Sequence, residues 1–223
     1  MSTTQDTLPE PTTRQPLSRD RILQAALAFA DEHGLAALSM RKVAATLNVE
    51  AMSLYNHIAN KSDIIAGITD LVAGEITLPT PDFDWKGEMR ARSQSAHKVL
   101  MKHPWAAQQF QAGHPPGPNM MTYLDATLGC LIAVGFSPRQ ADDARNTVDN
   151  HIYGYTLKRL NRPNRAREIS RAAKKTLKDI PKDTYPHLYK RTSELAGTET
   201  PDVDDFDFGL NLILDGLEAI SAR

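Results

Sequence analysis

Apolar side chains recur every three or four residues along most of the chain, which is the spacing of one face of an α-helix. Stripes of this kind occupy residues 18–34, 39–47, 49–57, 61–77, 85–103, 121–135, 137–158 and 206–220. No segment alternates apolar and polar residues as a half-buried strand does, and no repeat period stands out. The sequence therefore predicts an all-α protein of about nine or ten helices, with a weaker pattern around Pro163, Pro181 and Pro186.

Residues that favour helix ends stand at the borders of these segments. The predicted N-terminal caps are Ser18, Ser39, Asn60 and Ser137. Asp63 and Gln140 follow the last two of these caps by three residues, which is the spacing of a capping box. Gly34 is placed to end the first helix, and Asn48, which tolerates a positive φ, to break the chain between the second and third.

The composition places the chain among intracellular folded proteins. It has 223 residues, 41% of them hydrophobic and 24% charged, with a formal net charge of −1. No apolar run approaches the roughly 18 residues of a membrane span, and no secretory signal opens the chain, so we expect a cytoplasmic protein. Cys130 is the only cysteine, which excludes an internal disulfide and a Cys-rich zinc site. Residues 1–16 hold five Thr and three Pro and are predicted to be a disordered arm.

Charge is unevenly distributed toward the C-terminus. Residues 158–178 carry nine Lys or Arg and one acid, Glu168, whereas residues 199–207 carry five acids and no base. The favoured interpretation is a solvated surface. The alternatives are a patch that contacts phosphates, or two complementary segments that meet within one domain or across a dimer.

The first sixty residues have the spacing of a helix-turn-helix within a three-helix bundle. The second and third helices are short and joined by Asn48 and Val49, so the third depends on packing through side chains such as Leu54 and Ile58. The side chains left outside are Ala51, Met52, Ser53, Tyr55, Asn56 and His57. Such side chains suit a helix in the major groove of DNA, although an ordinary short helix has the same spacing.

These residues also resemble a known family. Residues 38–62, and above all Leu54-Tyr55-x-His57 and the pair Asn60-Lys61, are similar to the DNA-binding signature of the tetracycline repressor (TetR) family. Residues 208–218 are similar to the closing helix of the tetracycline repressor's own class. The likeness extends over most of residues 17–221. It implies a helix-turn-helix domain at 17–62 and a helical effector-binding and dimerisation domain at 63–223.

The resemblance also implies roles for individual residues. At the start of the second helix it places Ser39, Arg41 and Lys42 near DNA, where they contact phosphates and a base contact stays open. It places Ala51, Met52 and Ser53 in the groove, beside Asn56. The residues expected to contact backbone phosphates are Tyr55, His57 and Lys61. Positions 51–53 and 56 differ from the tetracycline repressor, so a different operator is expected.

The drug site departs further from the tetracycline repressor. Gln111 stands where that protein has a magnesium-binding His, and Thr77 stands near its drug-contacting His, so magnesium–tetracycline is not expected as the effector. No metal or cofactor is predicted, because the spacing of the imidazoles in residues 97–114 fits no metal template. The candidate residues for an apolar or amphipathic effector are Arg92, Ala96, Met101, Trp105, Phe110, His114, Met121, Leu124, Leu128, His151 and Tyr155. Arg92 lies on an apolar stripe, where it could anchor an anionic or carbonyl group or simply extend to the edge of the stripe.

The expected assembly is a homodimer in which residues 137–158 and the C-terminal helix form a four-helix bundle, with Leu214 and Leu217 at the interface. The expected function is a repressor that a small molecule releases from a pseudo-palindromic operator. Two alternatives remain. One is an architectural DNA-binding protein without an effector. The other is an all-α enzyme built on His103, His114 or His151, although no phosphate loop, zinc-hydrolase motif or nucleophile elbow is present in the sequence.

Overall fold

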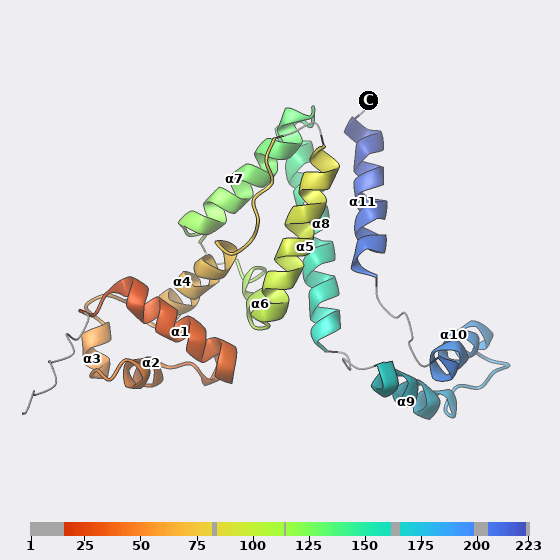
Figure 1. The fold of residues 1–223 in the computed structure, drawn as a ribbon, viewed down its shortest axis with the longest axis horizontal. Coiled ribbons are helices and arrows are strands. Elements are labelled where there is room, and N and C mark those ends of the chain that lie inside the picture. Colours follow the sequence, from red (N-terminus) through yellow and green to blue (C-terminus); the bar gives the residue numbers. More distant parts are fainter. Residues whose placement is uncertain (1–15, 82–83, 114, 162–165, 199–204, 222–223) are drawn as a thin grey trace, which may run out of the picture. The chain divides into compact units, whose positions relative to one another are not determined.

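A computed structural model describes residues 16–81, 84–113, 115–161, 166–198 and 205–221 of the chain. Within these residues it contains eleven α-helices, one 3₁₀ turn and no strand, which confirms the all-α prediction (Figure 1). The predicted arm, apart from its last residue, lies outside the described residues. The chain divides into two compact units, Met1–Ile68 and Thr69–Arg223. The boundary falls inside one helix, α4 (Lys61–Ala73), which therefore contributes to both units.

The first unit is built from short helices with polar caps. It contains α1 (Arg19–His33), the 3₁₀ turn η1 (Leu35–Ala37), α2 (Met40–Thr46), α3 (Ala51–Leu54) and the first residues of α4. The hydroxyls of Ser18 and Ser39 accept bonds from the third residue beyond each, and Asn60 caps α4 through the amide of Asp63 at 3.0 Å. Gly34 and Asn48 adopt φ of 77° and 54°, so both predicted breaks are confirmed. The core includes Ile22, Ala26, Val43, Leu54, Ile58 and Ile64.

The second unit is centred on a long helix, α8 (Pro138–Leu160), whose predicted capping box between Ser137 and Gln140 is present. Helix α8 packs against α5 (Trp85–Lys102), α6 (Ala106–Gln109), α7 (Pro118–Ala133) and α11 (Phe206–Ser221). Figure 1 shows α5 and α8 lying along one another, with α7 and α11 on either side. Helix α5 ends at Lys102, before the His103–Pro104 step, as predicted.

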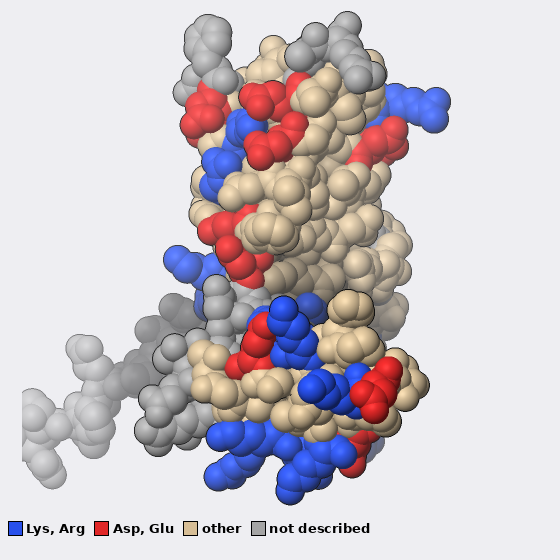
Figure 2. Space-filling model, turned by 90° about the vertical axis from the view of Figure 1, so that its right-hand side faces the viewer, with Lys and Arg blue, Asp and Glu red and all other residues tan. Residues whose placement is uncertain are grey.

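The remaining two helices form a hairpin that the sequence pattern did not predict. Helices α9 (Ala166–Leu177) and α10 (Pro186–Gly197) pack on each other, and the Ser170 hydroxyl donates to the Ala196 carbonyl at 3.0 Å. The described basic residues of this hairpin are exposed, and Figure 2 shows Lys and Arg interspersed with Asp and Glu on the face in view. Residues 162–165 of the basic segment and 199–204 of the acidic segment lie outside the described residues.

Two details of the helix predictions are wrong. Helix α4 ends at Ala73, so Gly74 lies beyond it rather than on it. The apolar spacing of residues 121–135 predicts that the inner face of α7 carries Met121, Leu124, Leu128, Leu131 and Ile132, but Met121 and Ile132 are 52% and 42% exposed. The buried residues of α7 are Tyr123, Thr127, Cys130 and Leu131. The apolar pattern did not predict this face because two of its buried residues, Tyr123 and Thr127, carry polar atoms.

In the described part of the chain, every helix is too short or too polar to cross a lipid bilayer.

Candidate functional site

The exposed turn that follows α2 carries the side chains predicted to face DNA. Helix α3 has only four residues, and the chain continues through a turn to His57. Leu54 and Ile58 are almost fully buried and hold this segment against the core of the first unit. Met52 is 75% exposed and Tyr55 is 48% exposed, although both are large and largely apolar. The segment therefore presents contact surface that the first unit itself does not cover.

An ion pair braces the residues after α3. The Arg19 guanidinium bonds to both carboxylate oxygens of Asp63, at 2.6 and 3.0 Å. It also donates to the carbonyl of His57 at 3.4 Å, while the Ala59 amide donates to Asp63 at 2.9 Å. The hydrogen bond from Arg19 lowers the pKa of Asp63 below its ordinary value. Helix α1, the turn after α3 and the start of α4 are thus tied together at the predicted DNA-contacting segment.

None of the residues predicted to contact DNA is buried. The exposed ones are Arg41, Lys42, Met52, Tyr55, Asn56 and His57, and the half-buried ones are Ser39, Ala51, Ser53 and Lys61. The Ser39 hydroxyl already caps α2, so any contact with DNA adds to that role.

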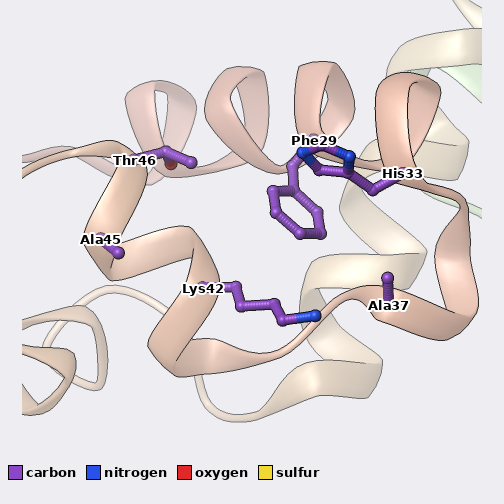
Figure 3. Close-up of a pocket in the computed structure, with 6 residues that line it drawn as sticks. All are labelled: Phe29, His33, Ala37, Lys42, Ala45 and Thr46. Atoms are coloured by element: carbon purple, nitrogen blue, oxygen red, sulfur yellow. The ribbon is translucent and has the colours of Figure 1, made fainter.

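Lys42 differs from the others because its side chain turns toward α1. Its ammonium lies 5.7 Å from the centroid of the Phe29 ring, and it lines a hollow whose other residues are Phe29, His33, Ala37, Ala45 and Thr46. Figure 3 shows the side chain extending below Phe29 toward Ala37. The side chain of Lys42 therefore lies against α1 while remaining exposed to solvent.

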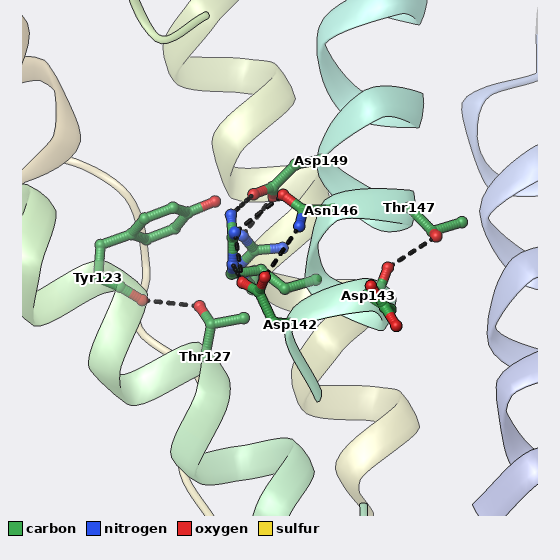
Figure 4. A network of polar contacts seen from close by, with 9 residues as sticks. Tyr123, Thr127, Asp142, Asp143, Asn146, Thr147 and Asp149 are labelled. Carbon is green, nitrogen blue, oxygen red and sulfur yellow. Dashed lines mark hydrogen bonds and ion pairs between the residues drawn. The ribbon is translucent and has the colours of Figure 1, made fainter. Parts of the chain in front are cut away.

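The second unit buries a charged network between α5, α7 and α8 (Figure 4). Arg92 is 0% exposed, so the interpretation that it extends to the edge of its stripe is wrong. Its Nη2 donates to Oδ1 of Asp149 at 2.5 Å, and its Cζ lies 4.5 Å from the centroid of the Tyr123 ring. The other oxygen of Asp149 accepts from Arg145 at 3.0 Å. The buried carboxylate of Asp149 thus accepts hydrogen bonds from two guanidinium groups.

The electrostatics of this network fix its protonation state. Burial opposes the charge of Arg92, but the interactions with Tyr123 and Asp149 raise the pKa of Arg92 above its ordinary value. Burial raises the pKa of Tyr123 far above its ordinary value, so the phenol keeps its proton. Arg92 is therefore a buried cation, and Tyr123 a buried neutral hydroxyl.

Comparison with known proteins gives the family. Residues 22–68 match the family described as bacterial regulatory proteins of the tetR family, and residues 78–221 match the tetracyclin repressor-like C-terminal domain. The HTH-type transcriptional repressor DrrR1 of Streptomyces coeruleorubidus is 30% identical over 225 residues, which cover 96% of this chain and 81% of that protein. The chain belongs to the TetR family. It is a DNA-binding transcriptional regulator with an N-terminal helix-turn-helix and a helical C-terminal domain.

Other members of the TetR family share the fold over nearly the whole chain. The crystal structure of ActR from Streptomyces coelicolor in complex with actinorhodin has a TM-score of 0.78 at 28% identity, and covers 94% of this chain and 100% of that one. The tetracycline repressor protein class E of Escherichia coli is 28% identical over 144 residues, which are 63% of this chain and 68% of that protein. The named relatives are regulators rather than enzymes.

Two of the predicted effector residues belong to an aromatic cluster in this TetR-family structure. His151 and Tyr155 lie with His97 and Phe206 in an aromatic cluster, and His151 Nε2 is 2.9 Å from the carbonyl oxygen of Phe206. Ala96 is buried, and Met121 is exposed on α7. The half-buried members are Met101, Trp105, Phe110, Leu124 and Leu128. His114 lies outside the described residues.

The sequence analysis missed three members of the buried network, which are Tyr123, Arg145 and Asp149. A signal for Asp149 was present, because a cation on a buried stripe needs a carboxylate and Asp149 directly follows the inward-facing Val148. No comparable signal marked Tyr123, which was not among the residues assigned to the inner face of α7. Among the described residues, no group of three or more His, Cys, Asp or Glu is placed to hold a metal ion.

Proposed function

We propose that this TetR-family regulator is a homodimeric, cytoplasmic repressor that binds a pseudo-palindromic operator and is released from it by a small molecule. The observation that carries the proposal is the segment from Ala51 to His57. Leu54 fixes it to the core, the Arg19–Asp63 pair braces its end, and Met52 and Tyr55 project into solvent. Rigid placement of exposed side chains on a short helix is what major-groove recognition requires.

The proposed contacts divide into two kinds. Ala51, Met52, Ser53 and Asn56 are assigned to base edges. The other residues are assigned to the phosphate backbone of the DNA, with a base contact left open for Arg41. Those at the start of α2 are Ser39, Arg41 and Lys42, and those around α3 are Tyr55, His57 and Lys61. Phosphate contacts position a protein on DNA, whereas base contacts specify the sequence.

The proposed dimer interface lies on α8 and α11. Phe208 and Leu212, one turn apart on α11, are 65% and 61% exposed, and Ile220 near the end of the helix is 49% exposed. Leu214 and Leu217, which the sequence analysis assigned to the interface, are buried within the subunit, so that assignment is wrong. Their burial follows from the contact between α11 and α8.

The interface is tested by comparing two substitutions on α11. Leu212→Asp is expected to leave a folded monomer, because it places a charge on the proposed interface. Leu214→Asp is expected to unfold the subunit, because it buries an unpaired charge. Light scattering and circular dichroism of both variants distinguish these results. A wild-type chain that is monomeric at micromolar concentration would contradict the proposed dimer.

Release by an effector is supported by the ligand complex of ActR and by a contact inside the second unit. The carboxylate of Asp70, near the end of α4, accepts from the amides of Asn119 and Met120 in the first turn of α7, at 3.3 and 2.9 Å. A negative charge stabilises a helix N-terminus, so this contact joins α7 to α4. Because α4 continues into the first unit, a shift of α7 changes the position from which α4 leaves the second unit.

The function is tested by sequencing DNA fragments that the purified protein selects from a random pool. The expected result is a two-fold repeat with half-sites about one helical turn apart. Little sequence preference with a steep salt dependence would instead indicate an architectural protein. Once an effector is found, it must bind less tightly in the presence of the operator, by the same factor by which it weakens operator binding.

A further inference from the structure

Three buried polar atoms of the second unit have no hydrogen-bond partner among the described residues. They are Nε and Nη1 of Arg92 and the hydroxyl oxygen of Tyr123. Both side chains are fully buried, and the guanidinium lies over the Tyr123 ring. A buried polar group without a partner destabilises the fold, and native proteins seldom leave one unsatisfied. Three such atoms on two touching side chains indicate that another molecule satisfies them.

The unmet donors of Arg92 belong to a cation, which forms its strongest hydrogen bonds with an anionic acceptor. Arg92 and Arg145 share the single carboxylate of Asp149, which is itself buried. The remaining bonds of Arg145 go to Asn146 and to Asp142, whose side chain is 54% exposed. Asp142 and Asp149 together balance the charges of Arg92 and Arg145, and every nitrogen of Arg145 has a partner. Nη2 of Arg92 bonds to Asp149, so the unmet donors of the network are Nε and Nη1 of Arg92.

The chemistry of the unmet atoms narrows the ligand further. Nε and Nη1 of Arg92 can only donate, and Tyr123 is a protonated phenol that can donate as well. Figure 4 shows the Tyr123 hydroxyl directed from α7 toward Asp149 on α8. Met89, Ala96 and Ile152, on the same helices, are fully buried and apolar. An acceptor oxygen attached to an apolar body matches both the donors and these neighbours.

We propose that Arg92 and Tyr123 are the polar anchor of the effector site and that the effector is an apolar organic acid whose carboxylate accepts from both. This inference rests on the proposed function, in which the second unit binds an effector. It also explains why position 123 carries a tyrosine. A phenylalanine would place the same ring against Arg92 and would not bury an unpaired hydroxyl.

The test uses benzoate, 2-naphthoate and anthraquinone-2-carboxylate, each paired with its methyl ester, and measures their binding to the full chain by calorimetry. At least one acid is expected to bind about tenfold more tightly than its ester, since a charge-assisted hydrogen bond contributes about 1.5–3 kcal/mol. Tyr123→Phe is expected to weaken binding of that acid about tenfold and to leave the ester unchanged. Arg92→Met is expected to abolish the preference for the acid, while Arg145 still pairs with Asp149. Tyr185→Phe, a change at the exposed residue that precedes α10, is the matched control.

Stability provides the second measurement. Without ligand, Tyr123→Phe is expected to unfold at the same or a higher urea concentration than the wild type, because it removes an unsatisfied hydroxyl. Clear destabilisation by Tyr123→Phe would show that the hydroxyl has a structural partner such as a bound water, and would overturn the proposal. No binding of any acid at millimolar concentration, or equal binding of acid and ester, would also overturn it.

Operator binding in the same samples distinguishes this inference from the proposed function. If the esters release the operator as well as the acids do, an effector function remains and the anchor is wrong. If an acid binds through Arg92 but the operator stays bound, the anchor is right and release by that ligand is wrong.

Discussion

The two units use the same kind of ion pair in opposite environments. In the DNA-binding unit, the side chains of Arg19 and Asp63 are 45% and 26% exposed, and Asp63 also bonds to a backbone amide. In the C-terminal unit, those of Arg92 and Asp149 are 0% and 6% exposed, and two nitrogens of Arg92 remain without a partner. Water screens the first pair and satisfies its spare atoms. The second pair must find every partner inside the protein or in a ligand.

The two ion pairs therefore have different roles. The exposed pair holds a segment in place, and the buried pair belongs to the network for which we propose ligand binding. The exposed pair fixes the position of a segment whose contacts lie outside the molecule, so its own contribution to stability is small. The buried pair carries the desolvation of two charges, which is tolerated only while both partners are present. Substitutions in the two pairs should therefore differ most in their effect on the free energy of unfolding.

The largest effect is expected for Asp149→Asn. This change keeps the volume but leaves Arg92 and Arg145 facing a neutral amide, and loss of one partner of a buried pair costs about 3–5 kcal/mol. Urea unfolding of the C-terminal unit, followed by circular dichroism, measures the loss. Asp142→Asn, in the same network but at the surface, should cost less than about 1 kcal/mol. Equal losses for the two variants would mean that the buried pair is hydrated in solution.

The next effect concerns operator binding. Met52→Ala is expected to change the preferred base at one position of each half-site, with a loss of about 1–3 kcal/mol against the original operator. Lys61→Ala should instead weaken binding to all sequences alike and reduce the slope of affinity against salt concentration. Selection of DNA fragments with each variant, followed by titration at two salt concentrations, tests both statements. An unchanged preference for Met52→Ala would show that the groove-facing residues have been assigned incorrectly.

The smallest effect is the pH dependence of the exposed pair. The pKa of Asp63 is lower in the folded state, so its contribution to stability is complete above the unfolded pKa of about 3.9. It is lost as the pH falls through the folded value. An exposed pair contributes about 0.2–1 kcal/mol, so wild type and Asp63→Asn should differ by this amount at pH 6 and by less at pH 3. Urea midpoints at both pH values measure the difference, and a constant gap would contradict the role of the pair.

The sequence by itself determined the local features of this protein. Ser18, Ser39, Asn60 and Ser137 cap the helices that they were predicted to cap, because a cap acts on amides two or three residues away. The unburied residues of 51–57 were readable for the same reason, since Leu54 and Ile58 fix which side of a short segment is buried and so which side remains outside. Periodicity sufficed where one face of a helix is apolar and the other polar.

Only the tertiary structure decided which polar groups are inside. Arg92 and Asp149 are 57 residues apart in the chain, and no local pattern states that they pair. Helix α7 turned an unexpected face inward because Tyr123 packs on the buried guanidinium, and α11 left Phe208 and Leu212 outside because α8 covers Leu214. An apolar stripe indicates that one face of a helix is buried, but it does not indicate which element packs on that face. The identity of a buried charge's partner depends on which helices meet, and that is a property of the packed fold.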